Sequence, residues 1–230
     1  MIRARSVWAI PLVLLSFALP AVSWADGDAS GWEILRSDAG IVVSRKVVAG
    51  SSFVAFRGEG DVEAPILAVA DVLVDVPHEN QWMDSVKEAR ILRKVSDSEY
   101  ILYSHVGTPP TMTDREFVTD VHVAVDASKR ALTVEMHSVD EASAPHTDFV
   151  RGNLTGSVFT LRGSADGKTT HVIAEIHCDP KGNVPSWAVN FFQKAWGFNT
   201  LRSLRRQVAA GAAPVNPLLK DRLADATPPG

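Results

Sequence analysis

The stretch EFVTDVHVAV, residues 116–125, decides the fold class. Every second side chain of an extended strand falls on the same face of the sheet. One face therefore carries Phe117, Thr119, Val121, Val123 and Val125, and the other includes Glu116, Asp120 and His122. Such alternation is typical of a strand with one face in an apolar core, so the sequence predicts a sheet.

The same pattern continues on both sides of this stretch. The next strand places Leu132, Val134 and Met136 on one face. Alternating, β-branched runs predict further strands at residues 41–48, 53–62, 86–95, 99–106, 149–161 and 168–178. Short turn-forming links such as Asp97-Ser98 and Asp166-Gly167 join them. Consecutive strands with short links predict an antiparallel sheet.

Helical segments interrupt the strands. Ala64-Pro65 opens a helical run to residue 74, and residues 77–82 form a second short helix. A longer helix follows Asn183 as its N-cap, with Pro185 in the first turn, where a missing N–H costs nothing. Its projection gives an apolar face of Trp187, Ala188, Phe191, Phe192, Ala195 and Phe198. The opposite face carries Ser186, Asn190, Gln193, Lys194, Gly197 and Thr200.

These elements predict an α+β fold, in which a curved antiparallel sheet is closed on its concave side by the long C-terminal helix. The aromatic face of that helix must cover something apolar. Core packing and the lining of a lipid site are both compatible with its periodicity.

Composition excludes several classes of protein. The 230 residues are 46% hydrophobic and 22% charged, which is typical of a globular domain and not of a disordered chain. A net charge of -4 argues against nucleic acid as a partner. Cys178 is the single cysteine, so neither an intrachain disulfide nor a Cys-rich zinc site can form. His171, Glu175 and His177 are spaced too widely along a strand to share one metal ion.

The N-terminus has the features of an export signal. Arg3 and Arg5 precede an apolar run at residues 7–22, and Ser23-Trp24-Ala25 places small residues before a cut after Ala25. An uncleaved membrane anchor is the rival interpretation, but the run is short and contains Pro11 and Pro20. We expect a signal peptide at residues 1–25, a domain at 26–208 and a flexible Pro/Ala-rich tail at 209–230, with a short helix at 218–223. We therefore expect a periplasmic or secreted protein.

Ordered segments along the chain resemble the START domain family of lipid-transfer modules. In the first half these are Phe53-x-x-Phe56-Arg57-Gly58-x-Gly60, Ala64-Pro65, Asp75, Gln81-Trp82 and Val86-Lys87-Glu88-Ala89. In the second half they are Asp114-Arg115-Glu116-Phe117-Val118, Val150-Arg151-Gly152-Asn153 and Asp179-Pro180-Lys181-Gly182-Asn183-Val184-Pro185-Ser186-Trp187. The matches run in family order from Trp32 to Val208.

The resemblance implies a helix-grip fold with a hydrophobic tunnel that holds one sterol, phospholipid, ceramide or other lipid, without a cofactor. It also implies that the loop at residues 107–113 works with the long helix as a gate, with Met112 at its tip; a plain hairpin turn is the alternative. The lipid-binding residues that we expect are Trp82, Tyr103, His105, Met112, Arg115, Phe117, Val121, Met136, Phe191, Phe192, Ala195 and Trp196.

Some positions of this set have a second interpretation. For Trp82 the sequence favours a core anchor over a ligand contact, and for Arg115 it favours a structural ion pair with Asp114 over a head-group contact. In sterol-binding relatives a buried acid and arginine approach the ligand hydroxyl, but Ser104 and Val121 occupy those positions here. Tyr103 and His105 could donate hydrogen bonds instead, although alternation places them on the face opposite Ser104.

Three functions follow as hypotheses. A lipid-binding and transfer protein leads, with a lipid as ligand, brief membrane contact through the gate loop, no nucleic acid partner and a monomeric state. An enzyme acting on a hydrophobic substrate is an alternative, because related helix-grip folds include cyclases. The sequence contains no Gly-x-Ser-x-Gly, HExxH or phosphate-binding glycine motif, so we expect no enzymatic activity. The third hypothesis is a sensor whose gate moves when ligand binds.

Overall fold

The computed structural model describes residues 31–184, 186–211 and 213–224, and in the long helix it describes side chains from Ala195 onward. The expected signal peptide at residues 1–25 and the last residues of the expected tail lie outside this range. None of the described helices is long and apolar enough to cross a membrane.

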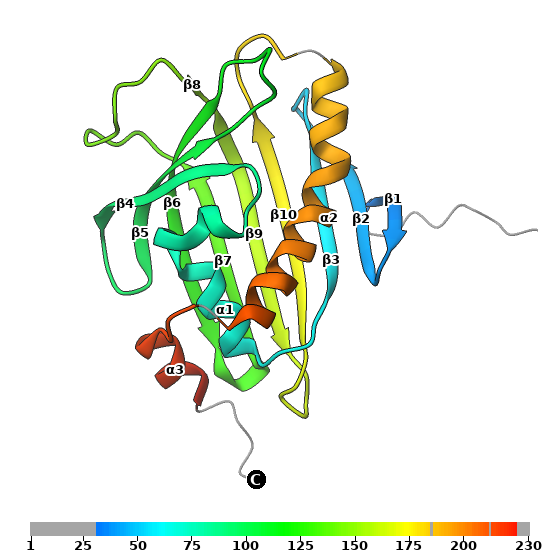
Figure 1. Ribbon diagram of the computed structural model, residues 1–230, viewed down its shortest axis with the longest axis vertical. Coiled ribbons are helices and arrows are strands. Elements are labelled where there is room, and N and C mark those ends of the chain that lie inside the picture. Colours follow the sequence, from blue (N-terminus) through cyan, green and yellow to red (C-terminus); the bar gives the residue numbers. More distant parts are fainter. Residues whose placement is uncertain (1–30, 185, 212, 225–230) are drawn as a thin grey trace, which may run out of the picture.

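The chain forms a single sheet with helices on one face (Figure 1). Its strands are β1 Glu33–Asp38, β2 Ile41–Val47, β3 Val54–Val62, β4 Val86–Lys94, β5 Glu99–Val106, β6 Arg115–Asp126, β7 Ala131–Ser138, β8 Val150–Arg151, β9 Asn153–Gly163 and β10 Thr170–Asp179. Its helices are α1 Ile66–Val74, η1 Val76–Gln81, η2 Ala127–Lys129, α2 Ser186–Ala210 and α3 Pro217–Ala224, of which η1 and η2 are 3₁₀ helices.

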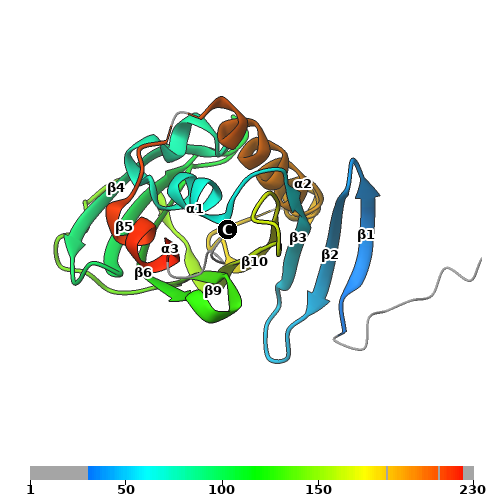
Figure 2. The ribbon, with the colours of Figure 1, turned by 90° about the horizontal axis from the view of Figure 1, so that it is seen from below.

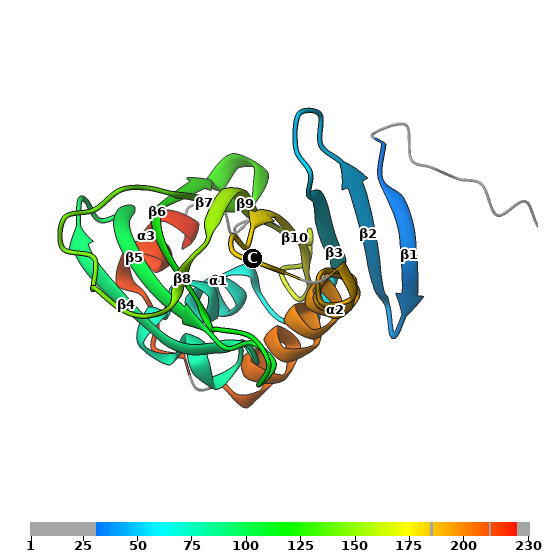
Figure 3. The ribbon, with the colours of Figure 1, turned by 90° about the horizontal axis from the view of Figure 1, so that it is seen from above.

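The strand order is β1-β2-β3-β10-β9-β7-β6-β5-β4, and every pair along it is antiparallel. Figures 2 and 3 show the sheet curving around α1, with α2 over the β3 and β10 side. The predicted α+β class and curved antiparallel sheet closed by a C-terminal helix are thus confirmed.

Two features of the sheet differ from the sequence prediction. The expected strand at 149–161 is divided at Gly152 into β8, which pairs in parallel with β6, and β9. A Cβ at Gly152 would lie 2.3 Å from the Phe117 ring, so a larger residue at this break would have to displace that ring. The edge strand β1 was not predicted, because its sequence EILRSD has no buried face and therefore no alternation to detect.

The core lies between the inner face of the sheet and the helices. Val69 and Ala70 of α1 and Leu201 and Leu204 of α2 are fully buried against strand residues such as Leu161. The short helix expected at 218–223 is present as α3, and Leu219 and Leu223 join the same core. Asp71 of α1 accepts a hydrogen bond from the backbone N–H of Asn216 at 2.8 Å, which fixes the start of α3.

The predicted outward face of the long helix is wrong in its second half. Gly197 and Thr200, expected on the polar side, are both buried. The reason is a close backbone approach: a Cβ added to Gly58 of β3 would lie 2.6 Å from the carbonyl oxygen of Gly197. A helix face with small residues can therefore be the buried face, because small residues let the helix lie directly on the strand.

This contact predicts the effect of adding one methyl group. Gly58→Ala should lower the free energy of unfolding by about 1–3 kcal/mol, because the new Cβ has no room against the backbone of α2. Gly156→Ala is the matched control, since nothing lies within 4 Å of a Cβ there. Urea unfolding of both variants measures the difference. Equal midpoints would contradict the close contact.

Candidate functional site

Strand register places one part of the expected lipid-binding set on the inner face of the sheet. Val121 pairs with Tyr100 on β5 and with Met136 on β7, and Phe117 pairs with Ser104. Val121 is 1% exposed and belongs to the core, whereas Phe117 and Met136 retain partial exposure. The inner face is therefore fully buried at Val121, whereas its apolar side chains Phe117 and Met136 are partly exposed.

Tyr103 and His105 lie on the outer face, as their alternation with Ser104 indicated. Tyr103 is 2% exposed, packs with Ile101 and Val118, and donates a hydrogen bond to Glu116 at 3.0 Å. Burial, together with this hydrogen bond, raises the pKa of the Tyr103 phenol to about 12. His105 stacks on Phe149 with ring centroids 4.0 Å apart. Through these contacts, Tyr103 and His105 stabilise the packing of Glu116 and Phe149 on the outer face of the sheet.

The expected gate loop is anchored at its C-terminal end by Asp114. Its carboxylate accepts hydrogen bonds from Lys87 Nζ at 2.8 Å and from the Thr108 backbone N–H at 2.9 Å, and contacts His105 Nε2 at 2.8 Å. The bond from Lys87 is the main cause of a pKa well below the usual value for Asp114. Both ends of the loop are thus held in one cluster.

The alternative ion pair between Arg115 and Asp114 is wrong. Adjacent residues of a strand point to opposite faces, so Asp114 pairs with Lys87 and Arg115 turns the other way. Arg115 donates to the carbonyls of Pro180 and Lys181, each at 3.2 Å, and to that of Thr113. It therefore ties the base of the gate loop to the segment that leads into α2.

A pocket of about 410 Å³ lies at this junction. It is lined by Thr111, Met112, Thr113, Arg115, Val150 and Asn183. Met112 and Arg115, which were predicted separately, are thus brought together between the gate loop and the segment before α2. We call this pocket the mouth.

None of the described helical positions of the expected set lines the mouth. Ala195 and Trp196 are partly buried, and Trp196 packs against the core. Phe191 and Phe192 lie in the part of α2 whose side chains are outside the described range. Trp82, at the end of η1, is 2% exposed and in the core.

A residue that sequence reasoning missed, Glu79, faces the interior from η1. Side chains at i and i+3 of a 3₁₀ helix eclipse one another, so Glu79 shares a face with the buried Val76 and Trp82. Burial raises the pKa of the Glu79 carboxyl to about 7. The spacing of Val76, Glu79 and Trp82 was the available signal, although it required knowing that the helix is 3₁₀.

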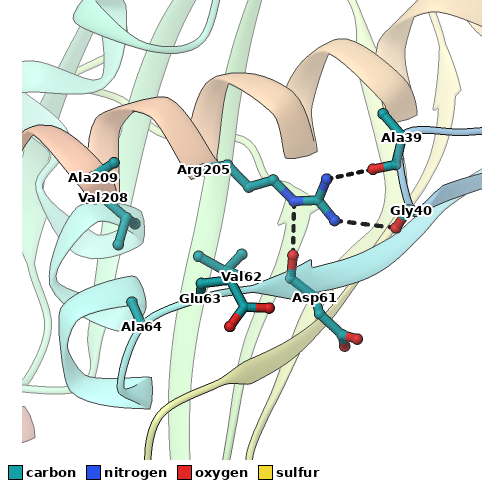
Figure 4. Close-up of a pocket in the computed structure, with 9 residues that line it drawn as sticks. All are labelled: Ala39, Gly40, Asp61, Val62, Glu63, Ala64, Arg205, Val208 and Ala209. Atoms are coloured by element: carbon teal, nitrogen blue, oxygen red, sulfur yellow. Dashed lines mark hydrogen bonds between the residues drawn. The ribbon is translucent and has the colours of Figure 1, made fainter.

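A second pocket, of about 480 Å³, lies beside the C-terminal half of α2 (Figure 4). Arg205 donates to the backbone carbonyls of Asp61 and Ala39 at 2.7 Å and of Gly40 at 3.1 Å. These bonds occupy its guanidinium and fix α2 to the end of β3 and to the β1–β2 turn. We therefore assign this pocket a structural role, as the place where α2 is attached to the sheet.

The family model described as "START domain" matches residues 18–210. This chain belongs to the START domain family. The mouse (Mus musculus) phosphatidylcholine transfer protein is 27% identical over 191 residues, which cover 80% of this START domain protein and 85% of the relative. The uncharacterized protein PA1579 of Pseudomonas aeruginosa is 25% identical, covering 77% and 86% of the two chains.

Solved structures agree with the START fold. The STAR-related lipid transfer protein (fragment 25–204) from Xanthomonas axonopodis superposes with a TM-score of 0.69 at 28% identity, covering 78% of this chain and 99% of that one. Human StAR-related lipid transfer protein 5 gives a TM-score of 0.71 at 20% identity, covering 80% and 89%, which supports the fold alone.

The polar residues considered as metal ligands in this START domain have other partners. His171 contacts Asp61 at 2.7 Å and Glu59 at 3.1 Å, Glu175 pairs with Arg57, and His177 contacts Thr155. Within the described ranges, no group of three or more His, Cys, Asp or Glu side chains could hold a metal ion. Burial raises the pKa of the Cys178 thiol to about 12, which keeps it unreactive near neutral pH.

The raised pKa of Glu79 predicts how stability depends on pH. The carboxyl releases its proton near pH 4.5 in the unfolded chain but near pH 7 in the folded protein. Between these values the folded state binds more protons, so stability falls as pH rises and levels off above pH 7. Relative to Glu79→Gln, the natural protein should lose up to about 3 kcal/mol across this window.

Urea unfolding at a series of pH values measures this difference. Asp71 also has a pKa raised by burial, but it is present in both proteins, so its effect cancels. Glu135→Gln, on the exposed side of β7, is the control and should follow the natural protein. Parallel curves for the natural protein and Glu79→Gln would show that Glu79 titrates normally.

Proposed function

We propose that this START domain protein binds one lipid between the inner face of the sheet and α2 and transfers it between membranes, without catalysing a reaction. Membership of the family and the names of its lipid-transfer relatives support this function. The observation that carries it is that two apolar side chains of the inner face, Phe117 and Met136, remain partly exposed although Val121 on the same face is fully buried.

The physical argument for an apolar ligand is the area that it would bury. Removing about 500 Å² of lipid surface from water is worth roughly 12 kcal/mol before ordering costs, so no cofactor is needed for useful affinity. We propose Phe117, Val121 and Met136 as sheet contacts and Trp82, Ala195, Trp196, Phe191 and Phe192 as helical contacts. Tyr103 and His105 are left out because they lie on the outer face.

We propose that the mouth is the route of entry. Met112 is partly exposed on the gate loop, and Arg115 holds this loop to the segment before α2. Movement of the loop would therefore open the space between β6 and α2. Brief membrane contact through Met112 fits a monomeric carrier of net charge -4, which has little attraction for anionic membranes.

Lipid uptake by the delipidated protein tests this function. Native mass spectrometry after incubation with phosphatidylcholine vesicles and with a mixed lipid extract should show one lipid per chain. Ser104→Phe fills space opposite Phe117 and should weaken uptake about tenfold or more, because the new ring occupies the proposed ligand site. Ala124→Phe, on the exposed outer face of β6, is the matched control.

Several outcomes separate the candidate functions. No uptake of any lipid would overturn the proposal. Chemical conversion of the bound lipid on long incubation would favour the enzyme, and binding without transfer between vesicles would favour a ligand-gated sensor.

We also propose export to the periplasm or the medium, supported by the apolar run and the Ser23-Trp24-Ala25 site. The mature protein isolated from its source should begin at Asp26, because cleavage follows Ala25. N-terminal sequencing and intact mass measure this directly. Retention of Met1 with the full mass would contradict cleavage.

A further inference from the structure

Glu79 lies on the inward face of η1, which packs against β4 and the end of α1. Val76 and Trp82, three residues away on either side, are 4% and 2% exposed. The other side chains of this helix, Pro77, His78, Asn80 and Gln81, are exposed. Glu79 itself is partly exposed, which makes it the least exposed polar side chain of the turn, and it lies on the same face as the apolar side chains of Val76 and Trp82.

Neighbouring charges do not neutralise this carboxyl group. His78 pairs with Asp75 at 2.8 Å, Asp84 lies 3.7 Å from Arg206, and Asp71 accepts from the Asn216 backbone. On β4, Lys87 is bonded to Asp114 and Glu88 to Arg90. Among the described side chains, none donates a hydrogen bond or a positive charge to Glu79.

Two further polar groups share this interior. Tyr100 projects from the inner face of β5 beside Val121, and both burial and the negative charge of Glu79 raise the pKa of its phenol. The indole Nε1 of Trp82 is buried and finds no hydrogen-bond acceptor in the described part of the chain. A buried donor without a partner destabilises a folded protein, so each such group calls for an explanation.

The three groups match one kind of ligand chemistry. An indole N–H only donates, a carboxylate only accepts, and a phenol does both. A hydroxyl group can accept from the first and donate to the second. An anionic phosphate would instead meet the carboxylate with no described cation to compensate.

We propose that Glu79, Tyr100 and Trp82 form the recognition site for the uncharged hydroxyl end of a lipid alcohol, and that Glu79 excludes lipids ending in an anionic phosphate. This inference rests on the proposed lipid-binding function and defines its substrate class. It differs from the Ser104 and Val121 positions, where an acid and an arginine stand in the sterol-binding relatives that the sequence resembles.

A pair of lipids with identical acyl chains tests the inference. Dioctanoylglycerol ends in a hydroxyl group and dioctanoyl phosphatidic acid in a phosphate. The delipidated, full-length protein should bind the glycerol lipid at least about tenfold more tightly at pH 7.5, measured by native mass spectrometry and tryptophan fluorescence. Glu79→Gln should reduce this preference several-fold, and Glu79→Lys should reverse it because its ammonium group attracts the phosphate.

Glu135→Lys is the matched control, since it makes the same charge change on the exposed outer side of β7 and should leave the preference unchanged. Where Glu79→Lys fails to fold, Glu79→Gln decides alone. Equal binding of the two lipids, or a preference that neither Glu79 variant alters, would overturn the inference while lipid binding stands. Failure of the natural protein to bind either lipid or any other would overturn the proposed function itself.

Discussion

The backbone contact between α2 and β3 constrains the whole arrangement. With no side chain between Gly58 and Gly197, the helix lies directly on the strand, and Arg205 fixes its C-terminal half to backbone carbonyls. The helix therefore covers the β2, β3 and β10 side of the sheet. The inner face of the other strands is left to α1, η1 and α3, as Figure 2 shows.

The interior between sheet and helices differs between its two ends, one at the β6–β7 turn and the other at the gate loop. Toward the β6–β7 turn, Val123, Leu132 and Val172 are sealed beneath α1, α2 and α3. Toward the gate loop, β6 continues through the partly exposed Phe117 to Arg115. The gate loop and the segment before α2 meet at this second end, because Arg115 bonds to both. In the proposed function, the ligand therefore enters at the end of the strands opposite to the one that carries most of the core packing.

The sequence predicted most of the sheet because most strands have one buried face. Alternation identified β6 and β7, whereas β1, with five of six residues exposed, gave no such signal. Helical projection failed at Gly197 and Thr200 because it ranks residues by polarity, while close packing selects them by size. The Phe56-Arg57-Gly58-x-Gly60 segment contains the glycine of this contact, but in the sequence it was recognised only as part of the family resemblance.

Some residues of the candidate site could likewise be predicted from the sequence, and others could not. Alternation separated Phe117 and Val121 from Tyr103, since it depends only on strand geometry. Met112 and Arg115 came from motif position, and their common pocket needed the three-dimensional path of residues 180–183. Glu79 escaped prediction because one acid in a short polar segment looks exposed until the 3₁₀ spacing is known.

An acid inside an apolar interior also separates stability from selectivity. Burial makes the ionised carboxyl of Glu79 costly, so the empty protein is less stable for having it. A purely apolar interior would bind acyl chains equally tightly, because the affinity for the chains depends on the apolar area that binding removes from water. The cost is therefore understandable only if a ligand hydrogen-bonds to the acid. In that case the group that weakens the empty fold is the one that distinguishes between lipids of equal chain length.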